Sequence, residues 1–308
     1  MDTTQMILLL VQQIAQMFLF AGIGFLLFKG KLIDLNGSRA IGNILIYLAL
    51  PAVIIKGFLL ERTPERMLGI AVSGAAGFAL LLLSVVITRL LFKKDAVASF
   101  AGAFSNPGFF GIPLIVASVG QDAVFYVACF IAFLNIGQWT YGVSVLTGQP
   151  LLSGLKPKKL IKAPFFIATM IGLLLFFTGT QLPEMIGGSI NALAALNTPL
   201  AMFTVGIYLA QTDILGMFRR KKLYLLAFVR LILIPVVSAV GLWLLPFASA
   251  EMKTALLLAA ACPVGSNVAV YSQLHGADYP YAVQTVVIST MLSILSIPAI
   301  VWFFSILP

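Results

Sequence analysis

Apolar runs, each long enough to cross a lipid bilayer, follow one another along almost the whole chain, with short polar segments between them. A membrane-crossing helix needs about 20 mainly apolar residues. Only 9% of the 308 residues are charged, whereas a soluble globular chain carries about 25%. Such a chain cannot hide its apolar surface from water, so we expect the bilayer to be its solvent. Helices follow, because lipid leaves open backbone polar groups unsatisfied.

The runs predict an all-α polytopic membrane protein with ten transmembrane helices. No positively charged segment precedes the first run, so we expect a retained span and not a cleaved signal peptide. The predicted spans are 5–28, 38–60, 67–91, 97–119, 122–147, 163–180, 186–211, 222–246, 252–274 and 280–306.

The basic residues are concentrated in alternate loops between these spans. The first, third, fifth and seventh loops hold fourteen of the nineteen Lys and Arg residues, and the ninth loop has only His275. Cytoplasmic loops carry the excess of positive charge in membrane proteins. We therefore expect the odd-numbered loops in the cytoplasm, both termini outside, and a place in the inner or plasma membrane.

Two of the apolar runs are interrupted near their middle, at matching places in the two halves. The first interruption has the sequence Phe104-Ser105-Asn106-Pro107-Gly108-Phe109-Phe110-Gly111-Ile112-Pro113, and the second has Ala261-Cys262-Pro263-Val264-Gly265-Ser266-Asn267. An offset of 156 residues carries Pro107 to Pro263. Paired interruptions of membrane helices are the best sequence indication of a transporter's binding site.

Five spans in each half imply that the second half crosses the membrane upside down relative to the first. We therefore predict a 5+5 inverted repeat, in which broken helices 4 and 9 cross. Residues 1–148 form the first repeat, 149–162 a basic cytoplasmic linker and 163–308 the second repeat. Pro51 in span 2 and the Asn197-Thr198-Pro199 segment in span 7 are further landmarks of the two halves.

Both interruptions lie near the middle of the bilayer. Asn106 is about nine residues into span 4, or roughly 14 Å, and Pro263 about eleven residues into span 9, or roughly 16 Å. Asn106 before Pro107 is typical of a helix N-cap, and Ser266 and Asn267 could cap the second half of span 9 in the same way. Each new half-helix would point a positive N-terminus at the centre, which suits a carboxylate.

The candidate binding residues come from the two interruptions, and a second set consists of polar residues elsewhere in the spans. The substrate-binding candidates are Asn106, Pro107, Gly108, Gly111, Pro113, Pro263, Gly265, Ser266 and Asn267. The candidates for cavity lining or coupling are Asn135, Gln138, Arg230 and Lys56. Arg230 could also reach the headgroups or pair with Asp213, and Lys56 could snorkel to the outer surface.

Other classes of function find little support in the composition. Cys129 and Cys262 both lie in apolar runs and His275 is the only histidine, so we expect no metal site. No phosphate-binding loop or nucleophile–base pair is present, which predicts neither a cofactor nor an enzyme. The net charge of +9 comes from short loop clusters, so we expect no nucleic-acid partner.

The stretch from Asn106 to Leu114 resembles the first crossover motif of the auxin efflux carrier family. The segment Pro263–Asn267, with Leu274-His275-Gly276 after it, resembles the second. The resemblance implies ten spans, an inverted repeat, crossing helices 4 and 9, and secondary transport of small organic anions. The chain lacks the long central loop of many plant auxin carriers, which favours the bacterial malate or malonate permease type. Ala269 stands where a counterpart of Pro113 would fall, so the half-sites differ.

We therefore expect a secondary active transporter of a small organic anion such as malate or malonate, working by alternating access at the crossing. The expected partners are that anion and the lipid bilayer, with H⁺ as the candidate coupling ion; monomer and homodimer are both open. The alternatives are a sodium-coupled carrier of the bile-acid-carrier type, against which the scarcity of buried acids argues, and a channel or sensor.

Overall fold

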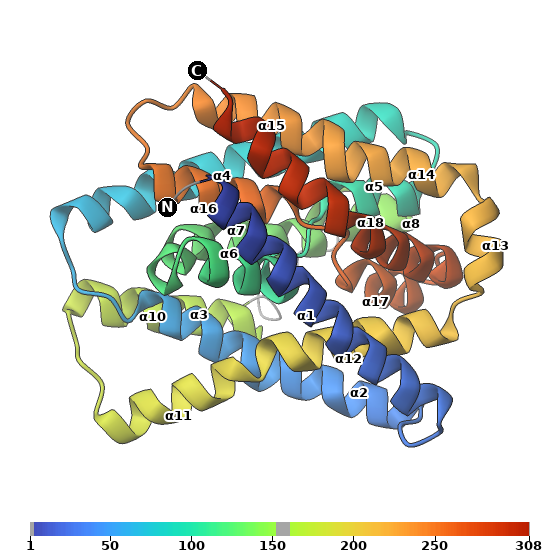
Figure 1. Cartoon of the computed structure of the whole chain (residues 1–308), viewed down its shortest axis with the longest axis horizontal. Helices are drawn as coiled ribbons and strands as arrows, with labels where there is room; N and C mark the ends of the chain where they lie inside the picture. Colours follow the sequence, from blue (N-terminus) through green and yellow to red (C-terminus); the bar gives the residue numbers. More distant parts are fainter. Residues whose placement is uncertain (1–2, 152–160, 308) are drawn as a thin grey trace.

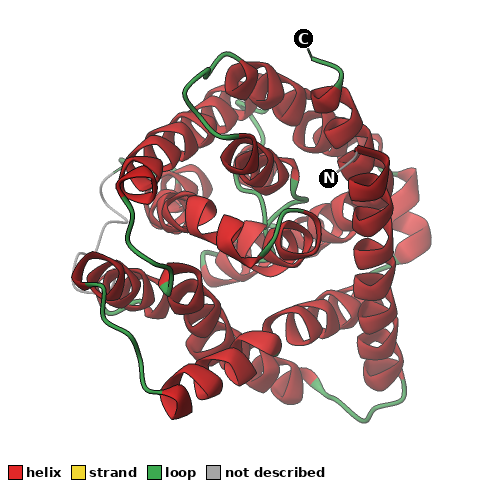
Figure 2. Ribbon diagram, turned by 60° about the vertical axis from the view of Figure 1, so that its left-hand side comes forward, coloured by secondary structure: helices red, strands yellow, loops and turns green. Residues whose placement is uncertain are grey.

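The computed structural model describes residues 3–151 and 161–307, and helices make up most of this part of the chain (Figures 1 and 2). Most of the predicted basic linker, including Lys156, Lys158 and Lys159, lies outside the described residues. Within the described ranges, seven helical stretches are long and apolar enough to cross a membrane, and Pro107–Ser118 and Pro164–Thr178 are shorter apolar helices. The chain is thus a helical polytopic membrane protein, as predicted.

The first half of the chain forms helices that contribute to both of the packing groups described below. They are α1 (Thr3–Lys29), α2 (Leu35–Ile44), η1 (Leu45–Ala49), α3 (Leu50–Phe58), α4 (Pro64–Leu91), α5 (Ala96–Ala103), η2 (Pro107–Gly111), α6 (Ile112–Ser118), η3 (Gln121–Ala123), α7 (Val124–Gly137), η4 (Gln138–Gly142) and α8 (Val143–Thr147).

The second half follows a similar order. Its helices are α10 (Pro164–Thr178), α11 (Glu184–Ala195), α12 (Asn197–Gln211), α13 (Ile214–Arg219), α14 (Lys221–Phe228), η5 (Val229–Leu233), α15 (Ile234–Trp243), α16 (Ala250–Ala261), α17 (Asn267–Leu274) and α18 (Tyr279–Ser305).

Three π-helical turns, η1, η2 and η5, each precede a proline by two residues. The proline ring clashes with the carbonyl four residues back, and the helix avoids this by widening. The residue before each proline accordingly bonds to the carbonyl five residues back: Leu50 to Leu45, Ile112 to Pro107, and Ile234 to Val229. The prolines at 51, 113 and 235 therefore widen their helices and do not end them.

The helices pack as two groups, each drawn from both halves of the chain (Figure 1). In the peripheral group, α1 packs along α12, and α3 packs on α10 and α11. The crossover group holds the two broken helices, and there α4 packs on α5 and α7, and α18 packs on α14, α16 and α17. Contacts of η2 with α12 and of α6 with α1 join the groups, so the first break lies at their boundary.

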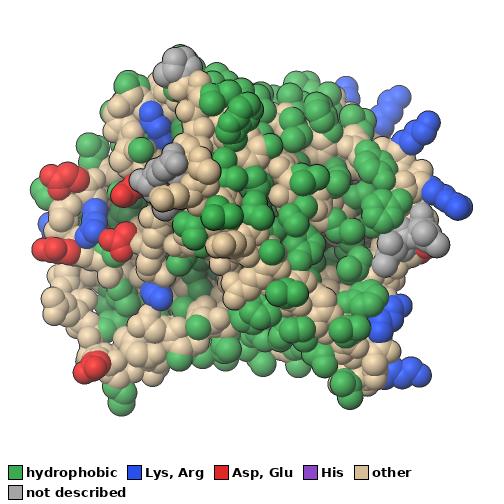
Figure 3. Space-filling view, viewed as in Figure 1, with side chains coloured by type: hydrophobic (Ala, Val, Ile, Leu, Met, Phe, Trp, Pro, Cys, Tyr) green, Lys and Arg blue, Asp and Glu red, His purple; other side chains and the backbone are tan. Residues whose placement is uncertain are grey.

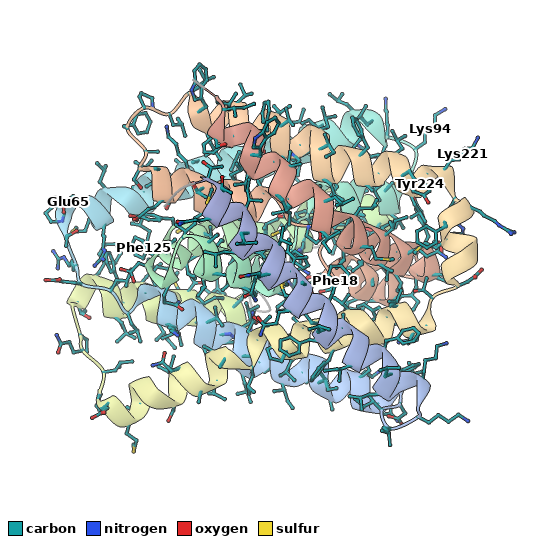
Figure 4. The ribbon with its side chains drawn as sticks, in the orientation of Figure 1. Phe18, Glu65, Lys94, Phe125, Lys221 and Tyr224 are labelled. Atoms are coloured by element: carbon teal, nitrogen blue, oxygen red, sulfur yellow. The ribbon has the colours of Figure 1, made fainter. Side chains whose placement is uncertain are left out.

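Charge is distributed unevenly between the two ends of the molecule. Lys and Arg side chains gather at the end that carries α13, whereas Asp and Glu lie mainly at the other end (Figure 3). Lys94 and Lys221 are at the first end and Glu65 at the second (Figure 4). Between the ends lies a band of exposed apolar side chains (Figure 3). The most exposed large apolar residues of the membrane helices include Leu19, Leu26 and Leu90, at about two-thirds to three-quarters exposed. Such a band suits the hydrocarbon core of a bilayer.

Candidate functional site

The two interrupted helices cross, and their non-helical residues pair with each other. Ser105 and Val264 form an antiparallel β-bridge. The backbone N–H of Gly265 donates a hydrogen bond of 2.9 Å to the carbonyl of Phe104. Backbone groups freed by the breaks would be costly at membrane depth without a partner. The bridge supplies that partner, and it holds the two breaks together.

Proline chemistry explains where each helix stops. The residue before a proline is pushed out of the α-helical region. Asn106, before Pro107, has φ −113° and ψ 56°, and Cys262, before Pro263, has φ −57° and ψ 150°. Phe104 is already extended, with φ −113° and ψ 110°. The prolines thus account for the conformations of Asn106 and Cys262, whereas α5 ends at Ala103, four residues before Pro107.

The second half of each broken helix begins at the crossing. Asn106 and Ser266 occupy the N-cap positions of η2 and α17, as predicted, but neither side chain makes a capping hydrogen bond. The expectation of side-chain caps is therefore wrong, because Asn267 bonds instead to Gln138 and is itself the first residue of α17. The first backbone N–H groups of a helix have no partner within it. In α17 the N–H groups of Val268 and Ala269 donate instead to the carbonyls of Gly265 and Ser266. Both positive helix ends face the crossing.

A small cavity of about 30 Å³ lies between these two helix ends. This volume holds about two water molecules, so a dicarboxylate does not fit without movement. The lining residues are Leu50, Ser105, Asn106, Pro107, Gly108, Phe109, Ile131, Leu134, Asn135, Gln138, Gly265, Ser266 and Asn267. None of these is charged, and four of them carry a side-chain amide.

Two features show how the polar groups of this cavity are arranged. The amide of Asn267 donates a 2.9 Å hydrogen bond to Oε1 of Gln138, which joins two of the lining residues. The hydroxyl of Ser105 is 97% buried and has no hydrogen-bond partner among the described residues. A buried polar atom without a partner is costly, and the Ser105 hydroxyl lies where a bound ligand could satisfy it.

A larger vestibule of about 370 Å³ adjoins the cavity. Phe109, Ser266 and Asn267 line both spaces. The other residues of the vestibule are Leu35, Ser38, Arg39, Gly42, Asn43, Leu45, Ile46, Thr204, Tyr208, Gln211, Val270, Gln273, Leu274 and Tyr279. They come from the peripheral group on one side and from α17 and α18 on the other. Arg39 is the charged residue among them.

The structure brings together eight of the thirteen candidate residues around the cavity. They are Asn106, Pro107, Gly108, Asn135, Gln138, Gly265, Ser266 and Asn267. The remaining five, Gly111, Pro113, Pro263, Arg230 and Lys56, line neither the cavity nor the vestibule. Gly111 faces the sulfur of Cys262, where an added Cβ would be 2.8 Å away. Lys56 lies half-buried on α3.

Arg230 occupies a place that no sequence-based alternative anticipated. It is 99% buried in η5 and donates hydrogen bonds to the carbonyls of Gly102 (3.1 Å) and Ala260. It therefore neither snorkels nor pairs with Asp213, whose carboxylate caps α13 by accepting from the N–H of Gly216. Its partners are backbone groups more than 25 residues away, which the sequence does not reveal.

Three polar residues of the site were absent from the candidates. Asn197, the first residue of α12, donates a 2.9 Å hydrogen bond from its side-chain amide to the carbonyl of Gly108. The N–H of Val264 donates to the hydroxyl of Ser289, at 3.0 Å. Ser105 directly precedes Asn106, and Asn197 belongs to the span 7 landmark, so both could have been identified as candidates from the sequence. Ser289 is one of several serines in α18, and nothing in the sequence distinguishes it.

The described residues hold no cluster of three His, Cys, Asp or Glu side chains that could bind a metal ion. The site is built from amides, hydroxyls and helix ends. Groups of this kind can donate hydrogen bonds to a polar or anionic solute.

Comparison with known proteins gives two matches that cover nearly the whole chain. Residues 9–301 match a family model described as "Membrane transport protein". A protein of Rhizobium meliloti (strain 1021) named "Putative malonate transporter" is 27% identical over 305 residues, which is 92% of this chain and 93% of the relative. The family model thus includes both interruptions and the cavity between them.

Proposed function

The chain belongs to the membrane transport protein family, which includes the auxin efflux carriers that it resembles, and within that family we propose that it is a secondary carrier of small organic anions. The chain is a transporter and not an enzyme. The proposed substrates are short carboxylates such as malonate or malate. The name of the Rhizobium meliloti relative supports this class.

The observation that carries the proposal is the convergence of two uncapped helix N-termini on one cavity. The helices that begin at Pro107 and Asn267 both point their positive ends at it. Side-chain amides and the unpartnered hydroxyl of Ser105 supply further donors. No Asp or Glu lies among the lining residues to repel a carboxylate. Positive helix ends and polar donors of this kind suit the binding of an anion.

We propose that transport proceeds by alternating access at the crossing. The vestibule reaches Ser266 and Asn267 from the end of the molecule where α1, α12 and α17 finish, and the small cavity lies beyond it. The proposed orientation of the loops makes this the cytoplasmic end, so the vestibule faces inward. We propose that breaking the hydrogen bond between Asn267 and Gln138 joins the cavity to the vestibule and makes room for a substrate.

The same lining supports a proposal about coupling. Neither the cavity nor the vestibule is lined by an Asp or Glu that could carry a proton. We propose that H⁺ travels on the substrate carboxylate itself, so that a more protonated anion is carried with less net charge. Uptake of malonate driven by an inward proton gradient, with the membrane potential clamped, tests this step.

The decisive experiment is uptake and counterflow of radiolabelled malonate and malate in proteoliposomes that contain the purified protein. Saturable uptake with counterflow is the expected result. Flux that rises linearly with concentration and shows no counterflow would contradict a carrier and favour a channel. Uptake that requires sodium would favour the sodium-coupled alternative.

The site itself is tested by Asn106→Ala and Asn267→Ala. Loss of one hydrogen bond to a charged ligand is expected to raise the KM for the carboxylate by about tenfold or more. Asn43→Ala, in the wall of the vestibule, is the matched control, with an expected change of less than about threefold. Unchanged transport in both cavity variants would contradict the assignment of the site.

A further inference from the structure

Among the residues that the structure describes, Arg230 is the largest fully buried side chain, with 1% of its surface exposed. Charged side chains at membrane depth are rare and require a partner. Among the described residues, no carboxylate lies within ion-pair distance of it. Its charge must therefore be stabilised by something other than an acid.

The partners of Arg230 are the ends of two helices. Gly102 lies in the last turn of α5 (Ala96–Ala103), and Ala260 lies in the last turn of α16 (Ala250–Ala261). These are the first halves of the two broken helices. The last carbonyls of a helix lack intrahelical partners, and one guanidinium group satisfies a carbonyl from each helix.

The partial charges of the helix ends at the crossing determine what the charge of Arg230 does there. Four helix ends meet there: the C-termini of α5 and α16, and the N-termini of the helices that begin at Pro107 and Asn267. Each end carries about half an elementary charge, negative at a C-terminus and positive at an N-terminus. The four contributions cancel, so the backbone alone gives the crossing no net preference for an anion.

We propose that Arg230 sets the anion selectivity of the carrier without touching the substrate. Its positive charge neutralises the two C-termini, so that the two N-termini remain as a net positive field in the cavity. This inference rests on the proposed function, since it explains how that site selects a carboxylate. Arg230 is a positioning and selectivity residue in this account, because it lines neither the cavity nor the vestibule.

The test measures how selectivity depends on substrate charge. Malonate, malonamate and malonamide have the same skeleton and carry two, one and no carboxylates. Each competes with labelled malonate in counterflow by wild type, Arg230→Gln, Arg230→Met and Arg230→Lys. The measured quantity is the inhibition constant of each compound, together with the thermal unfolding of each variant.

An effect through the field scales with the charge on the substrate. We expect Arg230→Gln and Arg230→Met to raise the constant by about tenfold for malonate and about threefold for malonamate, with malonamide unchanged. Arg230→Lys keeps the charge, so its malonate-to-malonamate ratio should stay within about twofold of wild type.

An equal change for all three compounds would overturn the inference, because a merely structural role does not distinguish substrate charge. If neither neutral variant folds, Arg230→Lys decides alone: an altered ratio overturns the inference and a preserved ratio supports it. Wild-type protein that carries out no counterflow with any of the three compounds would instead contradict the proposed function.

Discussion

The two breaks have similar sequences, but the protein holds them in different ways. The first break lies at the boundary between the two helix groups, where Asn197 of α12 donates to the carbonyl of Gly108. The second lies inside the crossover group, where Gln138 accepts from Asn267 and Ser289 accepts from Val264. The vestibule reaches Ser266 and Asn267 of the second break, whereas Phe109 is its one lining residue from the first. One break is thus anchored from outside its group, and the other borders the open space.

From this difference we propose that the two breaks have different roles in transport. A contact between groups must change when the groups move, whereas a contact within one group can persist through the cycle. We therefore propose the first break as the place of the conformational step and the second as the place where the substrate is admitted. The following variants test that proposal in decreasing order of expected effect.

The largest effect is expected where the two breaks touch. A Cβ at position 265 would lie 3.0 Å from the carbonyl oxygen of Ser105 and 3.4 Å from that of Phe104. These atoms belong to the backbone at the crossing, so they cannot move away from the added Cβ without moving the crossing itself. Gly265→Ala should therefore destabilise the protein by about 1–3 kcal/mol and abolish most transport. Thermal unfolding in detergent and uptake in proteoliposomes measure both.

Gly108→Ala is the matched control on the first break. Its Cβ would meet only the tip of the Leu50 side chain, at 3.1 Å. That side chain can move aside, so we expect a change of less than about 1 kcal/mol. An equal loss in the two variants would show that the crossing is not the tighter of the two positions.

The next largest effects are expected at the two hydrogen bonds that hold the breaks, the one from Asn197 to Gly108 and the one from Val264 to Ser289. Asn197→Ala leaves the carbonyl of Gly108 without its side-chain donor, and Ser289→Ala leaves the N–H of Val264 without its acceptor. Each should cost about 1–3 kcal/mol of stability. Only Asn197→Ala should change the maximal rate more than the KM, because only its bond joins the two groups. Rate and KM from proteoliposome uptake distinguish them.

The bond between Asn267 and Gln138 gives a smaller and more specific effect. Because the two amides contact each other, the double variant Asn267→Ala/Gln138→Ala should lose less than the sum of the single variants, with a coupling of about 1 kcal/mol. Asn106→Ala with Gln138→Ala should be additive, since no bond joins that pair. Carboxylate affinity from counterflow gives both cycles. Additivity in the first pair would contradict a closing role for the bond.

The smallest effects are expected at two aspartates that the 156-residue offset places in correspondence. Asp278 accepts a hydrogen bond of 2.9 Å from the N–H of Tyr281 and caps α18, so Asp278→Ala should cost about 1 kcal/mol. Asp122 forms an ion pair of 3.0 Å with Arg66 and is 60% exposed. Asp122→Ala should therefore cost less than about 0.5 kcal/mol. Thermal unfolding of both variants gives the order.

Much of the fold could be predicted from the sequence because its causes are local. Length and apolarity place the membrane helices, since the bilayer is the solvent and only helices satisfy the backbone there. Prolines 107 and 263 mark where the broken helices stop. A proline ring clashes with the carbonyl four residues back and restricts the conformation of the residue before it. Gly120 and Gly276, matched by the same offset, both have positive φ, of 121° and 68°. These properties depend on a few adjacent residues.

Membership of the membrane transport protein family could also be predicted from the sequence. The resemblance seen in the two interruptions is confirmed. The ten-span count and the inverted repeat stay predictions. The expected side-chain caps were wrong because the choice between capping and cross-helix bonding depends on what lies opposite. Asn267 meets Gln138, 129 residues away in the chain, and bonds to it instead.

By itself, then, the sequence determined a helical membrane protein with two interrupted helices and amide-rich residues at the interruptions. Only the tertiary structure decided that Ser105 pairs with Val264, that Asn197 holds Gly108, and that Arg230 joins two helix ends. The physical reason is that a helix end or a freed carbonyl accepts any donor that reaches it. Which donor does so is decided by the packing of distant helices and not by the residues beside it.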